Sequence, residues 1–331
     1  MGMALEPQVY AGSASRRFAE KVCEYLGARL GESEVITFPE GNTFVRLCQT
    51  VRDKEVYIIQ TVGVNPNDDF MEMLFWIDAL RRASASTVTA VMPYFSYSKA
   101  DKKDEPHVSI RARVCADCLE VTGADRIVTM DLHSPQVQGF FKIPVDNLYA
   151  QPVLCAYIKS IGIDNLVTVS PDVGFAKSAR KYAAVLGTTV AIGDKVRSSH
   201  DSNALVLDLI GDVQGRNALI VDDFTVTCGT LADTARILRE RGALRILACV
   251  SHAALRGPGL ERLGESPIEQ LVITDTVENP LARAQPKVKV ISVAPLFAEA
   301  IMRIHNRQSV SQLFDSVPAS VVEECLRASL P

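Results

Sequence analysis

Short β-branched runs alternate with helical patterns along the whole chain, and this alternation constrains the fold more than any other feature. The runs that we expect to form strands are residues 8–10, 35–38, 56–60, 88–92, 126–130, 166–169, 189–192, 218–221, 245–250, 271–274 and 288–293. Helical patterns lie between them, at residues 16–30, 70–83, 110–120, 152–161, 176–186 and 296–306. Such alternation predicts an α/β protein with mainly parallel sheets flanked by helices. The rhythm runs twice, with a break near residues 147–151, so we expect two α/β domains in tandem.

The composition of the 331-residue chain excludes several classes of protein. A formal net charge of −4 provides no basic excess for neutralising nucleic-acid phosphates, so we expect no nucleic-acid partner. No apolar run approaches the roughly 20 residues that span a bilayer, and the N-terminal residues lack a secretory pattern. We therefore expect no membrane partner and a cytoplasmic location. The eight cysteines fit no disulfide framework in a chain of this length.

Residues 217–230 carry the most informative local pattern. An apolar run ends in two carboxylates, Asp222 and Asp223, and a helical pattern starts near residue 231. Between them lie small and hydroxyl residues, namely Thr227, Cys228, Gly229 and Thr230. Small residues let backbone N–H groups approach a phosphate at a helix N-terminus, and neighbouring acids suit sugar hydroxyls or a hydrated Mg²⁺. The stretch therefore indicates a sugar-phosphate site, and the alternative is an ordinary strand–turn–helix with a capping threonine.

Two other expected strands also end in side chains that carry chemistry. Asp131 and His133 follow the run 126–130, where a histidine beside carboxylates can bind a metal, transfer protons or simply accept a hydrogen bond. Asp172 follows the run 166–169, where it can bind a metal or cap the next helix. Because the carboxyl ends of parallel strands meet at one edge of a sheet, these residues are candidates for ligand binding.

Two charged segments interrupt the alternation and are expected to be exposed loops. Residues 194–203 contain Lys195 and Arg197, which could close over a polyphosphate and stabilise charge that develops in a transition state. Residues 98–106 contain Lys99 and Asp101. For both segments the alternative is a solvated surface loop without a function.

The turn at residues 38–42 combines an aromatic ring with polar groups. Phe38 could stack on a purine while Glu40 and Asn42 read its edge, and the alternative is a β-turn with a buried phenylalanine.

These pieces, taken in their order along the chain, resemble the ribose-phosphate pyrophosphokinases, also called phosphoribosyl-pyrophosphate synthetases. The resemblance extends from residue 9 to about residue 315. The segments that carry it are residues 77–85, 131–133, 136–141, 143–148, 169–172, 292–296 and 303–306.

The resemblance implies two tandem phosphoribosyltransferase-like domains, each with a mainly parallel sheet flanked by helices. The expected limits are 1–148 for the first domain, 149–316 for the second, which holds the sugar-phosphate loop, and 317–331 for a C-terminal tail. The implied reaction transfers the β,γ-pyrophosphoryl group of ATP to the C1 hydroxyl of ribose 5-phosphate, with Mg²⁺ as cofactor. The family also implies a homo-oligomer, with a hexamer favoured.

The resemblance also assigns a role to each candidate residue. It implies that Lys195, Arg197 and His133 are catalytic, and that His133 and Asp172 orient Mg²⁺–ATP. The implied ATP-binding residues are Phe38, Glu40, Asn42, Lys99 and Asp101, and in the family the turn at 38–42 comes from a neighbouring subunit. The implied ribose-5-phosphate-binding residues are Asp222, Asp223, Thr227, Cys228, Gly229 and Thr230.

Several positions depart from the family pattern. Val226 stands where typical members have a third acid, Cys228 where they have Gly or Ala, and Glu40-Gly41-Asn42 where they have Asp-Gly-Glu. Lys99-Ala100-Asp101 stands where they have Arg-Gln-Asp. Two alternatives therefore stay open beside an active synthetase: a non-catalytic regulatory paralogue that assembles with one, and a phosphoribosyltransferase that consumes its product.

Overall fold

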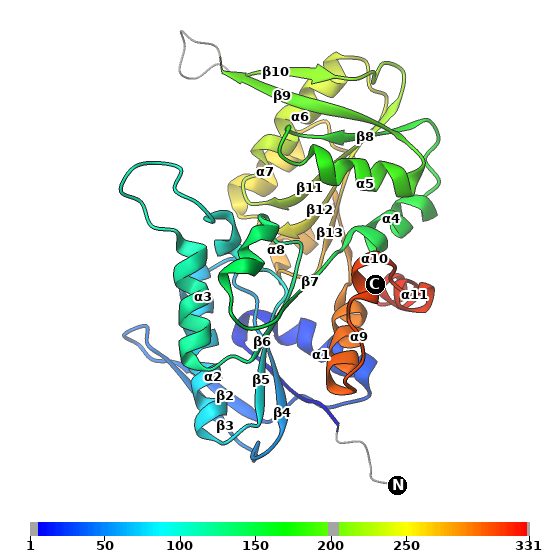
Figure 1. Ribbon diagram of the computed structural model, residues 1–331. Helices are drawn as coiled ribbons and strands as arrows, with labels where there is room; N and C mark the ends of the chain where they lie inside the picture. Colours follow the sequence, from blue (N-terminus) through cyan, green and yellow to red (C-terminus); the bar gives the residue numbers. More distant parts are fainter. Residues whose placement is uncertain (1–5, 198–204, 330–331) are drawn as a thin grey trace. The chain divides into compact units, whose positions relative to one another are not determined.

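The computed structural model describes residues 6–197 and 205–329 (Figure 1). Packing divides the chain into two compact units. The first unit comprises the chain up to Tyr149, together with Asp275–Glu278 and Ser292–Ala328. The second comprises Ala150–Thr274 and Asn279–Ile291, with Ser329. The domain limits 1–148, 149–316 and 317–331 stay a prediction. The packing units differ from them because residues 292–328 group with the first unit.

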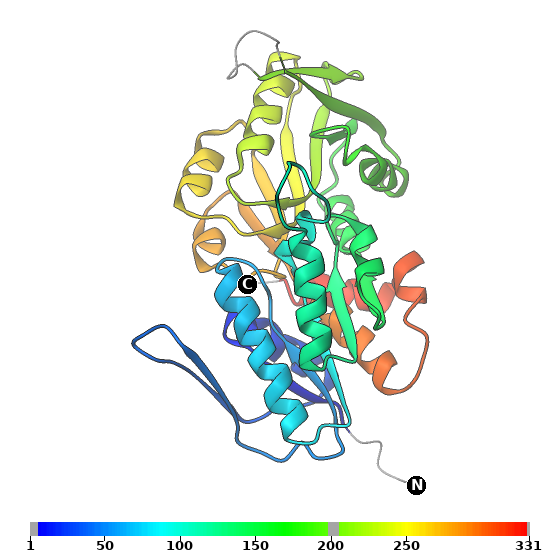
Figure 2. The same cartoon turned by 60° about the vertical axis from the view of Figure 1, so that its left-hand side comes forward.

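The first unit is built on a five-stranded parallel sheet. Its strand order is β1 (Gln8–Ala11), β4 (Glu55–Ile59), β5 (Thr87–Met92), β6 (Arg126–Met130) and β7 (Val145–Leu148). Helices α2 (Pro66–Arg82) and α3 (Arg111–Thr122) cover one face, and α1 (Arg16–Leu26) and α9 (Ala294–His305) cover the other (Figures 1 and 2). The short helices α10 (Gln312–Asp315) and α11 (Ala319–Arg327) follow α9, and α11 packs on it. Strands β2 (Ser33–Thr37) and β3 (Thr43–Leu47) form a separate antiparallel hairpin that packs on α2.

Large apolar side chains fill both faces of this sheet. Trp76 of α2 is fully buried and its ring centroid lies 5.7 Å from that of Tyr10 in β1. On the opposite face Phe18 of α1 meets Phe297 of α9 edge to face, with centroids 5.4 Å apart. Full burial of such a side chain contributes about 1.5–3 kcal/mol. Helix α9 therefore belongs to the core of this unit although it lies far along the chain.

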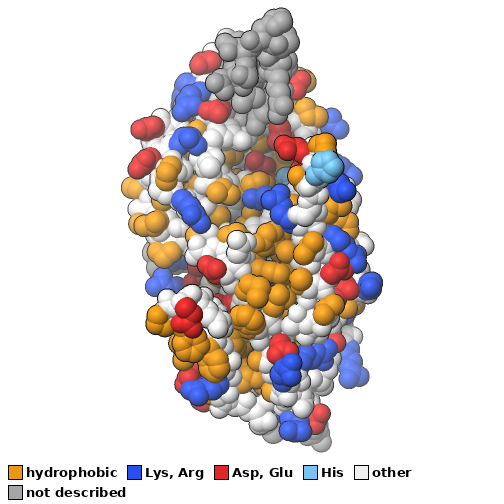
Figure 3. Space-filling model, turned by 90° about the vertical axis from the view of Figure 1, so that its left-hand side faces the viewer, with side chains coloured by type: hydrophobic (Ala, Val, Ile, Leu, Met, Phe, Trp, Pro, Cys, Tyr) orange, Lys and Arg blue, Asp and Glu red, His pale blue; other side chains and the backbone are white. Residues whose placement is uncertain are grey.

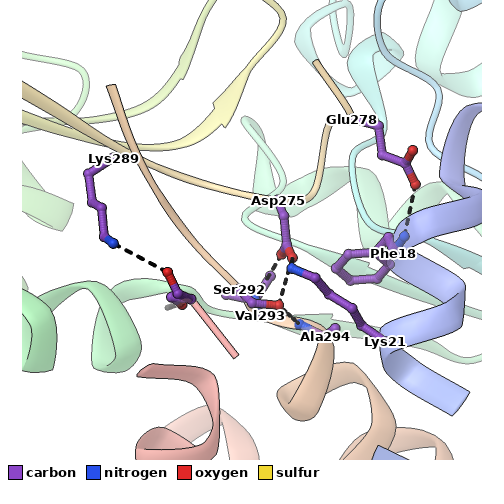
Figure 4. Close-up of polar contacts among 9 residues, drawn as sticks. Phe18, Lys21, Asp275, Glu278, Lys289, Ser292, Val293 and Ala294 are labelled. Carbon is purple, nitrogen blue, oxygen red and sulfur yellow. Dashed lines mark hydrogen bonds and ion pairs between the residues drawn. The ribbon is translucent and has the colours of Figure 1, made fainter. Parts of the chain in front are cut away.

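A polar cluster fixes the returning chain to α1 (Figure 4). The carboxylate of Asp275 is 7% exposed and accepts hydrogen bonds from Ser292 Oγ at 2.6 Å and from the Val293 N–H at 2.9 Å. Lys21 Nζ of α1 lies 2.8 Å from Asp275 Oδ2. Glu278 Oε1 accepts the N–H of Phe18, also at 2.8 Å. These contacts set the place where α9 begins.

The second unit is built on a seven-stranded sheet. Its order is β10 (Leu205–Ile210), β9 (Thr189–Arg197), β8 (Leu166–Ser170), β11 (Asn217–Thr225), β12 (Ile246–Ala253), β13 (Gln270–Thr274) and β14 (Val288–Ile291). All neighbours are parallel except β9 and β10. Helices α6 (Gly229–Glu240), α7 (Gly257–Glu265) and α8 (Pro280–Ala284) contribute to the core on one face, and α4 (Gln151–Ser160) and α5 (Ala176–Leu186) lie on the other (Figure 2). The sheet centre, β8–β11–β12, is apolar and buried, as parallel strands covered on both faces must be.

The α/β class and mainly parallel sheets predicted from the sequence are confirmed. Three strands were not expected, namely β3, β7 and β10. The segment 194–203 was expected to be an exposed loop, but residues 194–197 continue β9, because β10 pairs with them in antiparallel register. In the described parts of the chain, no helix has the length and apolar character needed to cross a membrane.

Candidate functional site

The end of β11 and the start of α6 place the residues of the predicted sugar-phosphate site together. Asp222 and Asp223 lie in the last part of β11, and α6 begins at Gly229. Asp222 Oδ1 accepts the N–H of Asp223 at 3.0 Å, and Asp223 Oδ1 accepts the N–H of Phe224 at 2.9 Å. Each carboxylate therefore uses one oxygen on the backbone of the following residue, which fixes its orientation at the strand end.

Electrostatics set Asp222 apart. Burial raises the pKa of its carboxyl well above the usual range, and the neighbouring charges of Asp223 and Asp172 raise it further. Acids gathered in this way repel one another, so each gains from a cation or from hydroxyl donors. The strand end is therefore suited to bind a divalent ion or a vicinal diol.

The β11–α6 loop, residues 226–228, has a strained and tightly held backbone. Cys228 precedes α6 with φ 56°, in the left-handed region, and provides no side-chain cap for the helix. Its N–H donates to Thr225 Oγ1 at 3.2 Å, and the Gly229 N–H donates to Thr227 Oγ1 at a long 3.4 Å. The Cys228 side chain is 1% exposed, and burial raises the pKa of its thiol to about 11. The thiol therefore packs as a small apolar group. The backbone of Cys228 leads directly into the N-terminus of α6.

Helix α7 contacts this loop at two points that the sequence did not single out. Arg262 Nη1 donates to the carbonyl of Thr227 at 2.7 Å. A Cβ on Gly259 would lie 2.9 Å from the carbonyl oxygen of Val226, so the helix backbone approaches the loop as closely as glycine permits. No local motif reveals either contact, because both depend on packing between segments about thirty residues apart.

Asp172 lies at the end of the neighbouring strand, β8. Its Oδ1 accepts the N–H of Phe175 at 2.9 Å and so holds the turn that precedes α5. The alternative that Asp172 is the N-cap of this helix is wrong, because the N-cap is Phe175 and it has no side-chain cap. Strands β8 and β11 pair in parallel with Val169 opposite Ile220, which brings their carboxyl ends together. The charge of Asp172 helps to raise the pKa of the Asp222 carboxyl, so the two acids lie near enough to interact.

In the first unit, His133 follows β6 and its side chain is exposed. The next residue, Ser134, donates its hydroxyl to Asp101 Oδ2, which ties the loop after β5 to the loop after β6. Lys99 Nζ lies 5.7 Å from the centroid of the Tyr94 ring, a cation–π distance. The structure thus brings Asp101 to the residue beside His133, at adjoining strand ends of one sheet. The segment after Lys102 is exposed, as expected, whereas Ser98 is buried.

The turn at residues 38–42 connects β2 to β3. It closes with the Phe38 N–H on the Asn42 carbonyl and the Gly41 N–H on the Phe38 carbonyl, both at 2.8 Å. Gly41 has φ 90°, which other residues rarely adopt. Phe38 is 39% exposed and packs only partly against Phe44, at 6.1 Å between centroids. The alternative of a buried phenylalanine is therefore wrong, and Glu40 and Asn42 are exposed beside the ring.

Lys195 and Arg197 occupy alternate positions of β9, paired with Leu207 and Leu205 of β10. Alternate residues of a strand share a face, so the two backbone positions face the same way. Their side chains lie outside the described residues.

The candidate metal ligands, His133 and Asp172, belong to different packing units. Among the described residues, no group of three or more His, Cys, Asp or Glu side chains is arranged to hold a metal ion. Mg²⁺ commonly takes only one or two protein carboxylates and completes its shell with substrate phosphates and water. The carboxylates of Asp222, Asp223 and Asp172 fit that mode of binding.

Comparison with known proteins identifies the chain. Residues 7–123 match the family described as the N-terminal domain of ribose phosphate pyrophosphokinase, and residues 188–315 match the phosphoribosyl synthetase-associated domain. The chain is 46% identical over 309 residues to the ribose-phosphate pyrophosphokinase of Caldanaerobacter subterraneus subsp. tengcongensis, covering 93% of this chain and 97% of the relative. Identity to the Chlorobaculum tepidum enzyme of the same name is 43% over 310 residues, covering 93% and 95%.

A solved structure gives the same result. The crystal structure of phosphoribosylpyrophosphate synthetase from Mycobacterium smegmatis matches 92% of this chain and 100% of its own, with a TM-score of 0.86 and 35% sequence identity. The fold class and the resemblance inferred from the sequence are both confirmed. By sequence and by structure, this chain belongs to the ribose-phosphate pyrophosphokinase family.

Proposed function

We propose that the chain transfers the β,γ-pyrophosphoryl group of ATP to the C1 hydroxyl of ribose 5-phosphate, giving 5-phosphoribosyl 1-pyrophosphate and AMP. The observation that carries this proposal is the strand–loop–helix at residues 217–240, where two carboxylates adjoin a helix N-terminus without a side-chain cap. Family membership supplies the reaction, and this constellation supplies a place for its sugar substrate.

The loop is suited to the 5-phosphate and the strand end to the sugar ring. Backbone N–H groups at the start of α6, with the hydroxyls of Thr227 and Thr230, would hold the phosphate, and the helix dipole favours its charge. Asp222 and Asp223 would accept hydrogen bonds from the ribose hydroxyls. Because Val226 is apolar, these two acids are the carboxylates that the β11–α6 segment offers.

The first unit is suited to the nucleotide. The exposed ring of Phe38 can stack on adenine, with Glu40 and Asn42 at its edge, while Lys99 and Asp101 lie near the loop that carries His133. Aromatic rings stack on any purine, so the polar pair decides how strongly adenine is preferred.

Mg²⁺ fits the carboxylate donors and would offset charge on the pyrophosphoryl oxygens when bound. Asp172 in the second unit and His133 in the first are the candidate protein ligands, and ATP oxygens and water would complete the shell. Phosphoryl chemistry demands positioning and charge neutralisation rather than covalent help from the protein. Lys195 and Arg197, from one face of β9, would supply that neutralisation, and each such contact is worth about 3–4 kcal/mol in comparable sites.

The proposal includes a homo-oligomer, with a hexamer favoured, and a cytoplasmic location. Exposed apolar side chains support the oligomer. Ile36, Phe38 and Phe44 of the hairpin and Met71 and Phe75 of α2 are all exposed, and apolar side chains gather on the face that carries these elements (Figure 3). Clustered apolar surface marks contact sites between proteins, so a second copy of the chain is the expected partner here.

AMP formation tests the reaction. Purified protein with Mg²⁺, ATP and ribose 5-phosphate is expected to release AMP, and a Lys195→Ala variant is expected to lose about 10²–10³-fold in rate. Release of AMP no faster than in that variant contradicts the proposal and favours a non-catalytic regulatory paralogue, which would instead stimulate an added active synthetase. Replacing ATP with GTP or CTP then tests whether Glu40 and Asn42 preserve the preference for adenine.

A further inference from the structure

Helix α7 lies against the β11–α6 loop, although nothing in the proposed reaction assigns it a part. The contact combines one hydrogen bond, from Arg262 Nη1 to the Thr227 carbonyl at 2.7 Å, with one close approach, between Gly259 and the Val226 carbonyl. Both carbonyls belong to the β11–α6 loop. The N–H groups that follow them along the chain are those at the start of α6. The helix therefore acts on the backbone that would meet the 5-phosphate.

The close approach leaves no room for a side chain. A Cβ on Gly259 would lie 2.9 Å from the Val226 oxygen and 3.3 Å from the Thr227 carbonyl carbon, and backbone atoms cannot move aside as a flexible side chain can. Gly264 on the same helix differs, because the nearest atom to its Cβ would be Gln285 Nε2 at 3.7 Å. The demand for glycine is thus specific to the residue that faces the loop.

The positive charge of Arg262 favours binding of an anion beside the β11–α6 loop. Among the described residues no carboxylate forms an ion pair with this guanidinium, and its hydrogen-bond acceptor is the neutral Thr227 carbonyl. The guanidinium also lies beside the first residue of α6, since a Cβ on Gly229 would be 3.4 Å from Arg262 Nη1. A cation next to a helix N-terminus adds to the positive potential already present there. With no internal counter-ion, this potential favours a phosphate in the loop.

We propose that Arg262 is a positioning residue for ribose 5-phosphate: it holds the Thr227 carbonyl so that the loop presents its N–H groups to the 5-phosphate, and Gly259 permits the approach. The inference rests on the proposed function for the identity of the sugar phosphate. Through Arg262, α7 would let the site distinguish ribose 5-phosphate from ribose without a phosphate.

The test measures binding and turnover separately. In Arg262→Met we expect the KM for ribose 5-phosphate to rise about 10- to 100-fold, as for loss of a charge-assisted hydrogen bond, while the KM for ATP changes less than about twofold. Arg262→Lys retains the charge and is expected to recover part of the loss. Gly259→Ala retains Arg262 and is expected to raise the same KM by displacing the loop.

Matched controls lie in the same unit. Gly264→Ala adds the same methyl group to α7 where there is room, and Arg245→Met removes an exposed ion pair with Glu269. Both are expected to leave the KM for ribose 5-phosphate unchanged. Circular dichroism and thermal melting show whether each variant folds.

Calorimetric titration with ribose 5-phosphate, and with ribose, separates this inference from the reaction. Binding of the phosphate by the wild type and its loss in folded Arg262→Met support the inference even if no AMP forms. An unchanged affinity for ribose 5-phosphate in folded Arg262→Met overturns it even if AMP forms. Equal losses for ATP and for the sugar phosphate, or no binding by the wild type, also overturn it.

Discussion

At the scale of single residues, two aspartates show opposite ways of holding a carboxylate. Asp275 has Lys21, Ser292 and a backbone N–H around it, so the chain itself neutralises the charge and supplies donors. Asp222 instead has Asp223 and Asp172 nearby, and burial raises its pKa. The first arrangement is complete without a ligand. The contacts of Asp222 with Asp223 and Asp172 leave its negative charge uncompensated, so a bound cation or hydroxyl donor would stabilise it.

This contrast predicts a conflict between stability and function at Asp222. A raised pKa means that the fold favours the neutral carboxyl, and the stability gained by protonation is lost as pH rises through that pKa. Asp222→Asn, which is neutral at all pH values, is therefore expected to raise the melting temperature of the substrate-free protein at pH 7.5 by about 2–4 °C. The same change is expected to abolish most AMP formation.

The control for this prediction is Asp233→Asn, which removes an exposed ion pair with Arg236. Exposed pairs contribute about 0–1 kcal/mol, so this variant should melt close to the wild type. The gain of Asp222→Asn over the control should shrink as the pH is lowered. A melting temperature for Asp222→Asn below that of the control contradicts the explanation.

The residues around Asp222 also show which parts of the site can be predicted from the sequence and which cannot. The acids, the loop and α6 were located because a buried apolar run followed by polar and small residues is a local pattern. Arg262 and Gly259 were missed because their contacts are made across the fold. Asp172 bonds in the turn before α5 rather than at its N-cap, and its role as a metal ligand stays a prediction.

Among the elements, two of the unexpected strands, β3 and β7, are short and contain polar residues. Strand β10 differs, because it reads Leu-Val-Leu-Asp-Leu-Ile and is mostly apolar. In β3 every residue is partly or fully exposed, and β7 reads Val-Asp-Asn-Leu. Strand β9 runs on through Gly193, Asp194 and Lys195 because β10 supplies the pairing partner. Hydrogen bonding between strands decides these cases, and periodicity in one segment cannot reveal it.

The start of α2 makes a pH-dependent contribution that can be measured. Asp69 Oδ2 accepts the N–H groups of Gly63 at 2.9 Å and Asn65 at 3.3 Å, and burial raises the pKa of its carboxyl to about 6. The stability gained by protonation is complete below the unfolded pKa, near 4, and is lost as pH rises through 6. Asp69→Asn keeps an acceptor without the charge.

We therefore expect the stability of Asp69→Asn relative to wild type to increase by about 2 kcal/mol between pH 4.5 and 7.5. Urea unfolding at four pH values in this range measures it. Asp68→Asn, an exposed neighbour in the same turn, should show a nearly constant difference. A constant difference for Asp69→Asn as well would show that its carboxyl is already ionised at pH 4.5.

The cluster around Asp275 gives a second prediction at this scale. Asp275→Ala removes the acceptor for three donors and leaves the Lys21 ammonium without its partner, so we expect a loss of about 3 kcal/mol in the free energy of unfolding. Lys21→Met retains the bonds from Ser292 and Val293 and should cost about 1 kcal/mol. The exposed pair Arg16–Glu20 on the same helix is the control, and Arg16→Met should cost less than either.

At the scale of the whole molecule, the chain leaves the first unit after Tyr149 and contributes to it again at residues 275–278 and 292–328. The alternation of strands and helices could not predict this return, because a helix in either unit has the same amphipathic pattern. What fixes α9 is the packing of Phe297 on Phe18 and the bonds to Asp275. The family resemblance predicts residues for both halves of the reaction, but it does not predict that the chain returns to the first unit.

The proposed homo-oligomer leads to the last prediction, that one catalytic site is completed by two chains. The exposed Phe38 turn belongs to a hairpin, and the resemblance to the family implies that this turn enters a neighbour's nucleotide site. Phe38→Ala and Lys195→Ala should each be nearly inactive alone. Co-expressed and purified together at equal amounts, they should regain about a quarter of wild-type AMP formation, since random mixing in a symmetric oligomer pairs intact halves at one site in four. Mixing either variant with itself is the control, and sizing confirms that the mixed oligomer matches the wild type. If each site were built from one chain, the mixture would stay as inactive as its components, because every chain would carry one of the two defects.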